Sequence, residues 1–180
     1  MRSRLMALPG VLICGAVMAA CTGGPPEPPE TPPAVTGDPA ARAQAAAWLD
    51  AAALPPGAVR SDAGVAEFLS FTGWPCTPVE ELEGYWAVPE STVAETANWL
   101  LANPTADLVT TGIGPYPDDS ELDNVTVGYI PAEGSQEGVV YTVVQTADGV
   151  AVRAEVAALT ESAVCPELPD GGTLGPPGQG

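Results

Sequence analysis

Two valine-rich segments in the C-terminal half of the chain restrict its fold more strongly than any other part of the sequence. They run from Gly138 to Thr146 and from Val150 to Leu159, with Asp148-Gly149 between them. Aspartate followed by glycine accepts the positive φ angles of a two-residue hairpin turn, and apolar segments on both sides are typical of paired strands. The sequence therefore predicts an antiparallel β-hairpin here.

The second of these segments alternates between two kinds of side chain. Apolar residues at the even positions from 150 to 156 alternate with Ala151, Arg153 and Glu155. Because successive side chains of a strand point to opposite faces, this pattern predicts an antiparallel strand that is covered on one face only. The other candidate strands are Tyr85 to Val88, Asp107 to Ile113 and Asn124 to Ile130.

Two helices are predicted ahead of these strands. The first begins at Asp38-Pro39, because aspartate is a good N-cap and proline suits the first helical position, and it ends before residues 54–57. The second begins at Thr92, with Glu95 at the spacing of a capping box, and it ends at Asn103-Pro104. Ser91 is an alternative cap. Both helices carry apolar side chains along one face, so each can cover a sheet.

These elements predict an α+β fold, in which an antiparallel sheet of about four strands from the C-terminal half packs against the two helices. We expect this globular domain to cover residues 38–166. Residues 167–180 are rich in glycine and proline. That composition is typical of a disordered tail.

Residues 1–20 have the parts of a bacterial secretory signal. Arg2 and Arg4 give a positive start, Leu5 to Val17 is apolar, and Ala19-Ala20 supplies small residues before Cys21. The pattern resembles the signal peptide of bacterial membrane lipoproteins. The resemblance implies that diacylglycerol is attached to the Cys21 sulfur and that the chain is cut before Cys21. An uncleaved anchor would need roughly 20 apolar residues, and an ordinary signal peptide does not account for the cysteine.

Residues 21–37 follow the predicted cleavage point and contain six prolines. Such a segment cannot build a core, and polyproline II extends by ~3.1 Å per residue, so it is expected to be a tether behind the lipidated Cys21. The alternative is that its proline pairs bind an aromatic-lined groove.

The chain has four cysteines, of which Cys14 belongs to the predicted signal and Cys21 is expected to carry lipid. Cys76 and Cys165 remain. An exported protein meets an oxidising compartment, where two remaining cysteines usually pair, so we predict one structural disulfide. A metal pair or a redox dithiol is the alternative, although those sites use closer spacing.

Charge restricts the partners. After Cys21 there are 23 acidic residues and only Arg42, Arg60 and Arg153 as cations, which leaves a net charge of −20. Nucleic acid and anionic lipid surfaces repel such a chain, so no nucleic-acid partner is predicted, and the lipid on Cys21 is expected to hold the protein at the membrane.

The chain contains neither histidine nor lysine. Without histidine, Ser-His-Asp and Cys-His mechanisms and imidazole metal sites are excluded. Without lysine, Schiff-base chemistry, Ser-x-x-Lys acyl transfer and the P-loop lysine are excluded as well. No catalytic residue is therefore predicted, and the chain is not expected to be an enzyme.

One acidic cluster and one arginine stand out as candidate sites. Asp118, Asp119, Glu121 and Asp123 supply hard oxygen ligands that can hold calcium as a cofactor, although the spacing departs from an EF-hand and a solvated turn is the simpler interpretation. Arg153 lies in the middle of a predicted strand. It either recognises an anionic ligand through its planar fork or forms a salt bridge with Glu155.

Three short motifs, at residues 54–58, 85–89 and 148–153, follow one another in an order that resembles uncharacterised exported lipoproteins of actinobacteria. The resemblance implies an exported α+β domain and assigns no activity. We therefore expect a lipid-anchored extracytoplasmic protein at the outer face of the cell membrane, with a non-catalytic role in binding an envelope protein or another envelope component. The alternatives are a carboxylate-based hydrolase acting on envelope glycans and a calcium-stabilised structural module.

Overall fold

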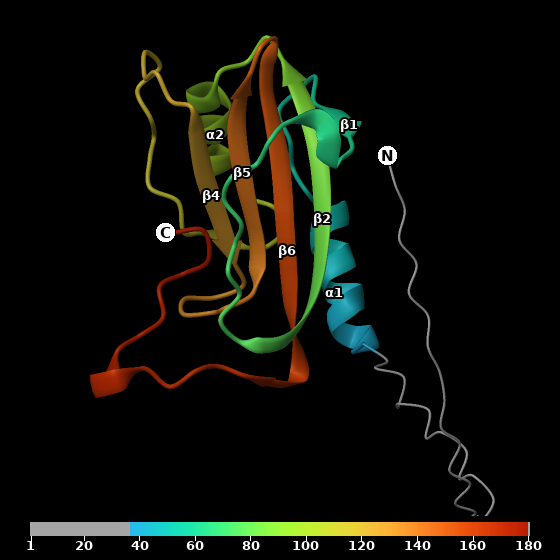
Figure 1. The fold of residues 1–180 in the computed structure, drawn as a ribbon, viewed down its shortest axis with the longest axis vertical. Coiled ribbons are helices and arrows are strands. Elements are labelled where there is room, and N and C mark those ends of the chain that lie inside the picture. Colours follow the sequence, from blue (N-terminus) through green and yellow to red (C-terminus); the bar gives the residue numbers. More distant parts are fainter. Residues whose placement is uncertain (1–36, 180) are drawn as a thin grey trace, which may run out of the picture. The chain divides into compact units, whose positions relative to one another are not determined.

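The computed structural model describes residues 37–179, whose framework is an antiparallel sheet with the strand order β1-β2-β6-β5-β4-β3 (Figure 1). The strands are β1 (Val59–Ser61), β2 (Thr77–Pro89), β3 (Val109–Thr110), β4 (Asn124–Ile130), β5 (Gly138–Thr146) and β6 (Gly149–Val164). The helices are α1 (Pro39–Asp50), α2 (Val93–Ala102) and the short 3₁₀ turns η1 (Ala63–Val65) and η2 (Pro169–Gly171). The predicted signal peptide, the predicted lipidation site at Cys21 and nearly all of the predicted tether lie outside the described residues.

The α+β class is confirmed, but the expected number of about four strands is wrong, because the sheet has six. The hairpin of β5 and β6 forms as predicted, with Thr146 opposite Gly149. Strand β2 is much longer than the predicted Tyr85 to Val88, and it pairs with β6 along nearly its whole length. Its first half carries Glu80, Glu81 and Glu83, and glutamate is depleted in strands. The edge strand β3 keeps only two residues of the predicted strand Asp107 to Ile113, and the three-residue edge strand β1 was not predicted.

Both helix starts are confirmed by their caps. The Asp38 carboxylate accepts hydrogen bonds from the backbone N–H groups of Ala40 and Ala41, and it also accepts one from Glu161 on β6. These three donors, that of Glu161 foremost, hold the pKa of Asp38 below its usual value. At α2, Thr92 and Glu95 exchange both bonds of a capping box, at 3.1 and 2.9 Å, so Thr92 rather than Ser91 is the cap.

The two helices lie on one face of the sheet and form the apolar core with it (Figure 1). Helix α1 contacts β2 and β6, whereas α2 contacts β4 and β5. Two tyrosines are buried in this core: Tyr129 donates to the carbonyl oxygen of Leu100, and Tyr141 shares a 2.6 Å hydrogen bond with Thr105. Burial raises the pKa of both phenols, that of Tyr141 to about 12. We call this side of the sheet the helix face.

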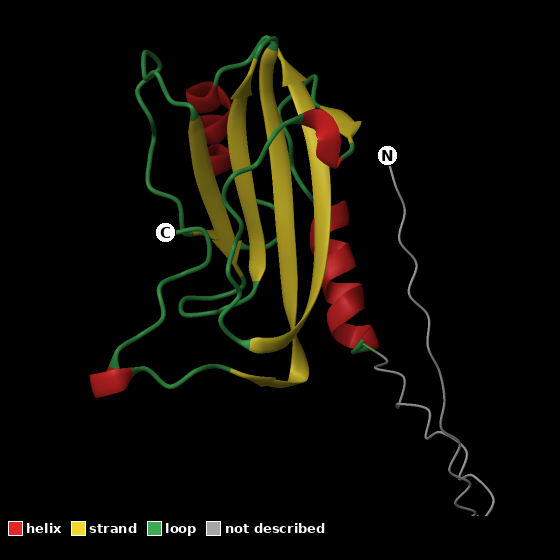
Figure 2. Cartoon of the chain, in the orientation of Figure 1, coloured by secondary structure: helices red, strands yellow, loops and turns green. Residues whose placement is uncertain are grey.

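The opposite side, which we call the polar face, is covered by two irregular segments. They are residues 66–75, the cover segment, and residues 174–179, the C-terminal segment. In Figure 2 the cover segment runs as a loop in front of the strands, whereas α1 and α2 lie behind them. Strand β6 is therefore buried on both faces from Gly149 to Ala158. The prediction that only one of its faces is covered is wrong, because Arg153 and Glu155 bind the cover segment.

The predicted disulfide between Cys76 and Cys165 is confirmed. It closes a sequence separation of 89 residues, from the end of the cover segment to the residue after β6. Next to it, β2 and β6 begin their pairing with Thr77 opposite Val164. The bond thus fastens the cover segment to the end of the longest strand pair.

Among residues 37–179, neither α1 nor α2 has the length and apolar character that crossing a bilayer requires.

Candidate functional site

A buried ion pair forms the centre of the polar face. Arg153 is 1% exposed, and its Nη2 donates to Glu155 Oε2 at 2.7 Å. The two residues are two positions apart on β6, so their side chains lie on the same face of the strand. Thr142 of β5 lies beside them, with its Oγ1 3.5 Å from Arg153 Nη2. This arrangement is the salt bridge with Glu155 that the sequence offered as one interpretation of Arg153.

The ion pair holds the cover segment by its backbone. Arg153 Nη2 donates to the carbonyl oxygen of Ser70. In return, the backbone N–H of Thr72 donates to both Glu155 oxygens, at 3.1 and 3.2 Å, and its hydroxyl donates to Oε2 at 3.0 Å. Charged partners strengthen such bonds. Two charges in the strand thus fix the position of a loop more than 80 residues away in sequence.

Aromatic rings enclose the guanidinium from the solvent side. The Arg153 guanidinium carbon lies 5.0 Å from the ring centroid of Phe68 and 4.5 Å from that of Phe71. Both distances are within the range of cation–π attraction. Phe68 also contacts Tyr85, whose pKa is raised to about 12, mainly by its hydrogen bond to Glu83. The rings therefore add apolar contact to the polar contacts that hold the cover segment.

Arg153 Nε is buried and has no hydrogen-bond partner among the described residues. An anion that binds Arg153 would have to displace the cover segment, because the guanidinium is enclosed and its charge is already paired. The anion-binding role stays a prediction from the sequence.

A cleft of about 530 Å³ opens beside this ion pair. One wall is the end of the cover segment, including Phe71 and Trp74, and the other is the C-terminal segment from Gly175 to Gln179. Thr126 of β4 and Thr142 of β5 contribute from the sheet. The cleft thus combines parts of the chain that are separated by up to about a hundred residues, and its position next to the disulfide follows from the chain path.

The second wall lies close against the sheet because glycines leave room for it. A side chain at Gly128 would come within 2.3 Å of the Pro177 carbonyl oxygen, so only glycine allows this approach. The same carbonyl accepts a 3.1 Å bond from the Thr111 hydroxyl. The predicted disordered tail therefore includes a stretch that packs on β4, and Pro177 is buried there.

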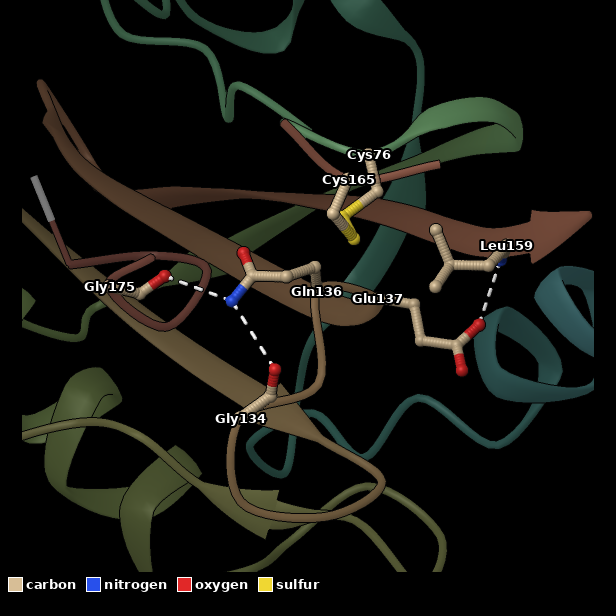
Figure 3. Close-up of a disulfide and its surroundings, with 7 residues drawn as sticks. All are labelled: Cys76, Gly134, Gln136, Glu137, Leu159, Cys165 and Gly175. Carbon is tan, nitrogen blue, oxygen red and sulfur yellow. Dashed lines mark hydrogen bonds between the residues drawn. A yellow bond between two sulfur atoms is a disulfide. The ribbon is translucent and has the colours of Figure 1, made fainter. Parts of the chain in front are cut away.

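Gln136 connects this wall to the turn before β5. Its Nε2 donates to the carbonyl oxygens of Gly134, at 3.4 Å, and Gly175, at 3.3 Å (Figure 3). The neighbouring Glu137 points the other way and accepts a 2.8 Å bond from the backbone N–H of Leu159. Glu137 follows the cleft residue Gln136 in the sequence, but its carboxylate is thus directed to β6 and away from the cleft.

None of the residues that line the cleft is ionisable. Its polar side chains are hydroxyls and amides, and its apolar surface comes from aromatic rings and prolines. Such a surface can bind a ligand through uncharged hydrogen bonds and apolar contact, but it provides no general acid or base.

The acidic residues proposed for calcium lie elsewhere. Asp118, Asp119, Glu121 and Asp123 are exposed in the loop between β3 and β4. Over residues 37–179, no group of three or more acidic, histidine or cysteine side chains is arranged to hold a metal ion. The calcium site stays a prediction without geometric support.

None of the residues that line the cleft was predicted as a site residue; only the strands β4 and β5, which carry Thr126 and Thr142, were predicted, and neither wall has a periodic pattern. The aromatic residues Phe68, Phe71 and Trp74, which follow one another at three-residue intervals in a segment without a clear helix or strand pattern, were the available signal, since such rings need a surface to pack on. Comparison with known proteins found no family model, no curated protein and no solved structure that matches this chain.

Proposed function

We propose that the protein is a non-catalytic binding module, lipid-anchored through Cys21 at the outer face of the cell membrane, and that the cleft is its ligand site. The observation that carries this proposal is that the cleft has an uncharged lining. The lining residues come from two loop segments that meet over the sheet. A cleft of several hundred Å³ with apolar walls and a few polar groups is typical of ligand sites.

The same lining argues against the alternative of a carboxylate-based hydrolase at this position. Such an enzyme needs two carboxyl groups facing its substrate. Glu155 is the carboxylate closest to the cleft in the network described above, but it is buried, paired with Arg153 and hydrogen-bonded to Thr72. It has neither the access nor the free lone pairs that acid or base catalysis requires.

The location rests on the sequence. The signal-like residues 1–20 and the cysteine at position 21 support a lipid anchor. The Cys76–Cys165 disulfide agrees with an oxidising compartment outside the cytoplasm. A lipidated protein with a mature charge of −20 would use its folded part for recognition and its lipid for attachment.

In-cell photo-cross-linking tests this function. A photoreactive residue is placed at Gly73 or at Gly175, because both line the cleft and a Cβ atom added at either position meets nothing within 4 Å. Ala51, which is exposed at the end of α1 on the helix face, is the matched control position. We expect one envelope component to be captured from both cleft positions and not from Ala51.

The anchor is tested in the same experiment with Cys21→Ser. This variant should lose acylation by intact mass and should capture less of the partner. Equal capture from Ala51 and from the cleft positions, or no capture from any of them, would contradict the proposed site.

A further inference from the structure

The polar groups of the cleft restrict the chemistry of its ligand. The side chains of Thr126, Gln136, Thr142 and Gln179 are hydroxyls and amides. Each of these groups can donate and accept a hydrogen bond. Gln136 and Gln179 both use their Nε2 groups within the protein, which leaves their side-chain oxygens as acceptors. A matching ligand presents several neutral groups that also donate and accept, as hydroxyls and amides do.

The walls add an apolar requirement. Phe71 and Trp74 line one wall, and Pro176 and Pro177 line the other. Aromatic rings favour flat apolar surfaces, and tryptophan combines such a surface with a polar N–H. A ligand that fits both the walls and the polar groups has an apolar face bordered by hydroxyls. A sugar ring has this combination, with C–H groups on one face and hydroxyls around the edge.

The charge distribution restricts the chemistry of the ligand further. The cleft offers no cation to an acidic ligand, and the strongly negative chain repels anions at longer range. The cleft also offers no carboxylate to an ammonium group. Burying a charge of either sign without a partner is unfavourable, because the charge loses its hydration and gains no compensating interaction. A ligand without charge is therefore favoured.

The position of the cleft on the sheet favours a saccharide over a peptide as the ligand. Peptides that bind by adding a strand need a free sheet edge. Here β5 is paired with β4 on one side and with β6 on the other, so it has no free edge. Strand β3 covers only Tyr129 and Ile130 of the outer edge of β4, but the cleft meets the sheet at Thr126 and Thr142, through side chains that point out from its polar face. The volume of about 530 Å³ suits a compact ligand rather than a long chain.

We infer that the cleft binds a short neutral saccharide, with its ring against Trp74 and Phe71 and its hydroxyls on the threonine and glutamine side chains. This inference rests on the proposed function, because it names the ligand class of the same site. The ligand can be a free oligosaccharide or the end of an envelope glycan, since both present the same groups.

Titration calorimetry with the purified protein tests the ligand class. The probes are maltose, cellobiose and N,N′-diacetylchitobiose, with glucuronic acid as the charged counterpart and a proline-rich peptide as the peptide counterpart. We expect at least one neutral disaccharide to bind, and we expect the amide resonances of Gly73 and Gly175 to shift with the same dependence on its concentration. Glucuronic acid and the peptide should not compete.

A pair of variants places the binding in the cleft. Trp74→Ala should weaken the affinity by at least about tenfold, because an aromatic side chain in a desolvated pocket carries much of the binding free energy. Leu69→Ala is the matched control, since Leu69 lies on the same cover segment, is 85% exposed and does not line the cleft. It should bind like the unaltered protein, and thermal unfolding should show that both variants are folded.

The outcomes separate the two proposals. If no neutral disaccharide binds while cross-linking from Gly73 still captures a partner, the saccharide class is wrong and the binding module stands. If the peptide binds instead and loses affinity in Trp74→Ala, the cleft is a peptide site. If the disaccharide binds equally well to Trp74→Ala, the ligand lies elsewhere. Failure of both the titrations and the cross-linking overturns the proposed function itself.

Discussion

The two faces of the sheet are closed by different means. On the helix face, two regular helices bury apolar side chains such as Trp48, Leu100 and Val152. On the polar face, irregular loops are held by the buried pair of Arg153 and Glu155 and by a disulfide. The first kind of closure is non-directional and spread over many contacts, whereas the second depends on a few specific bonds. The helix face should therefore tolerate change, and the polar face, with its cleft, should not.

The largest effect is expected from removing the disulfide. Cys76→Ser with Cys165→Ser should lower the free energy of unfolding by about 4 to 5 kcal/mol, because the bond closes a loop of 89 residues in the unfolded chain. Urea unfolding of the oxidised protein and of the double variant measures the difference.

Hydrogen exchange shows which face depends on the bond. The amide of Thr72, bound to Glu155, should exchange faster in the double variant, while that of Thr96, inside α2, should lose less protection. Equal losses at both amides would mean that the two faces open together.

The next effect comes from the ion pair. Arg153→Met should cost about 3 to 5 kcal/mol, because it leaves the buried Glu155 carboxylate without its cation. Replacing both, as Arg153→Met with Glu155→Leu, should recover much of this loss, since apolar residues of similar volume can fill a buried ion-pair site. Equilibrium unfolding of the unaltered protein, of the single variants Arg153→Met and Glu155→Leu, and of the double variant gives the coupling free energy between the two residues. A double variant no more stable than Arg153→Met would show that the contacts to the cover segment, rather than the charges, matter most.

The helix face should respond to alkaline pH. Tyr141 has its pKa raised to about 12 by burial. The folded protein thus favours the neutral phenol. The resulting contribution to the free energy of unfolding is fully present below the ordinary tyrosine pKa of about 10, and it is lost as the pH rises towards 12. This loss should reach about 2 kcal/mol by pH 12. Unfolding free energies from pH 8 to 12 measure it, and Tyr141→Phe is the control in which this part of the decline is absent. An unchanged decline in the control would assign it to other groups.

The smallest effect concerns the start of α2. Thr92→Ala removes the cap of the helix and should cost about 1 kcal/mol. Ser91→Ala is the matched control, because Ser91 bonds to Thr96 and leaves the capping box intact. Thermal unfolding should show the larger decrease in Tm for Thr92→Ala. The opposite order would make Ser91 the functional cap.

The sequence predicted those parts of the fold that depend on local patterns. The bounds of β4 and β5, the caps at Asp38 and Thr92 and the turn before β6 follow from alternation, capping residues and Asp-Gly chemistry. It could not predict that β2 continues through its glutamates, because propensity disfavours such residues and long-range pairing with β6 decides the outcome. Nor could it bring Ser70 and Thr72 to β6, since that contact depends on side chains more than 80 residues away.

The short edge strands have a consequence for how copies of the protein meet. A long free strand edge is a template on which another chain can pair and aggregate. Here the outermost strands β1 and β3 are three and two residues long. The part of β2 that β1 leaves uncovered contains Glu80, Glu81 and Glu83, whose charges repel an approaching strand of the same acidic protein. The glutamates that obscured a strand in the sequence thus protect the β2 edge of the sheet from self-association, so that copies crowded together would not pair through this edge.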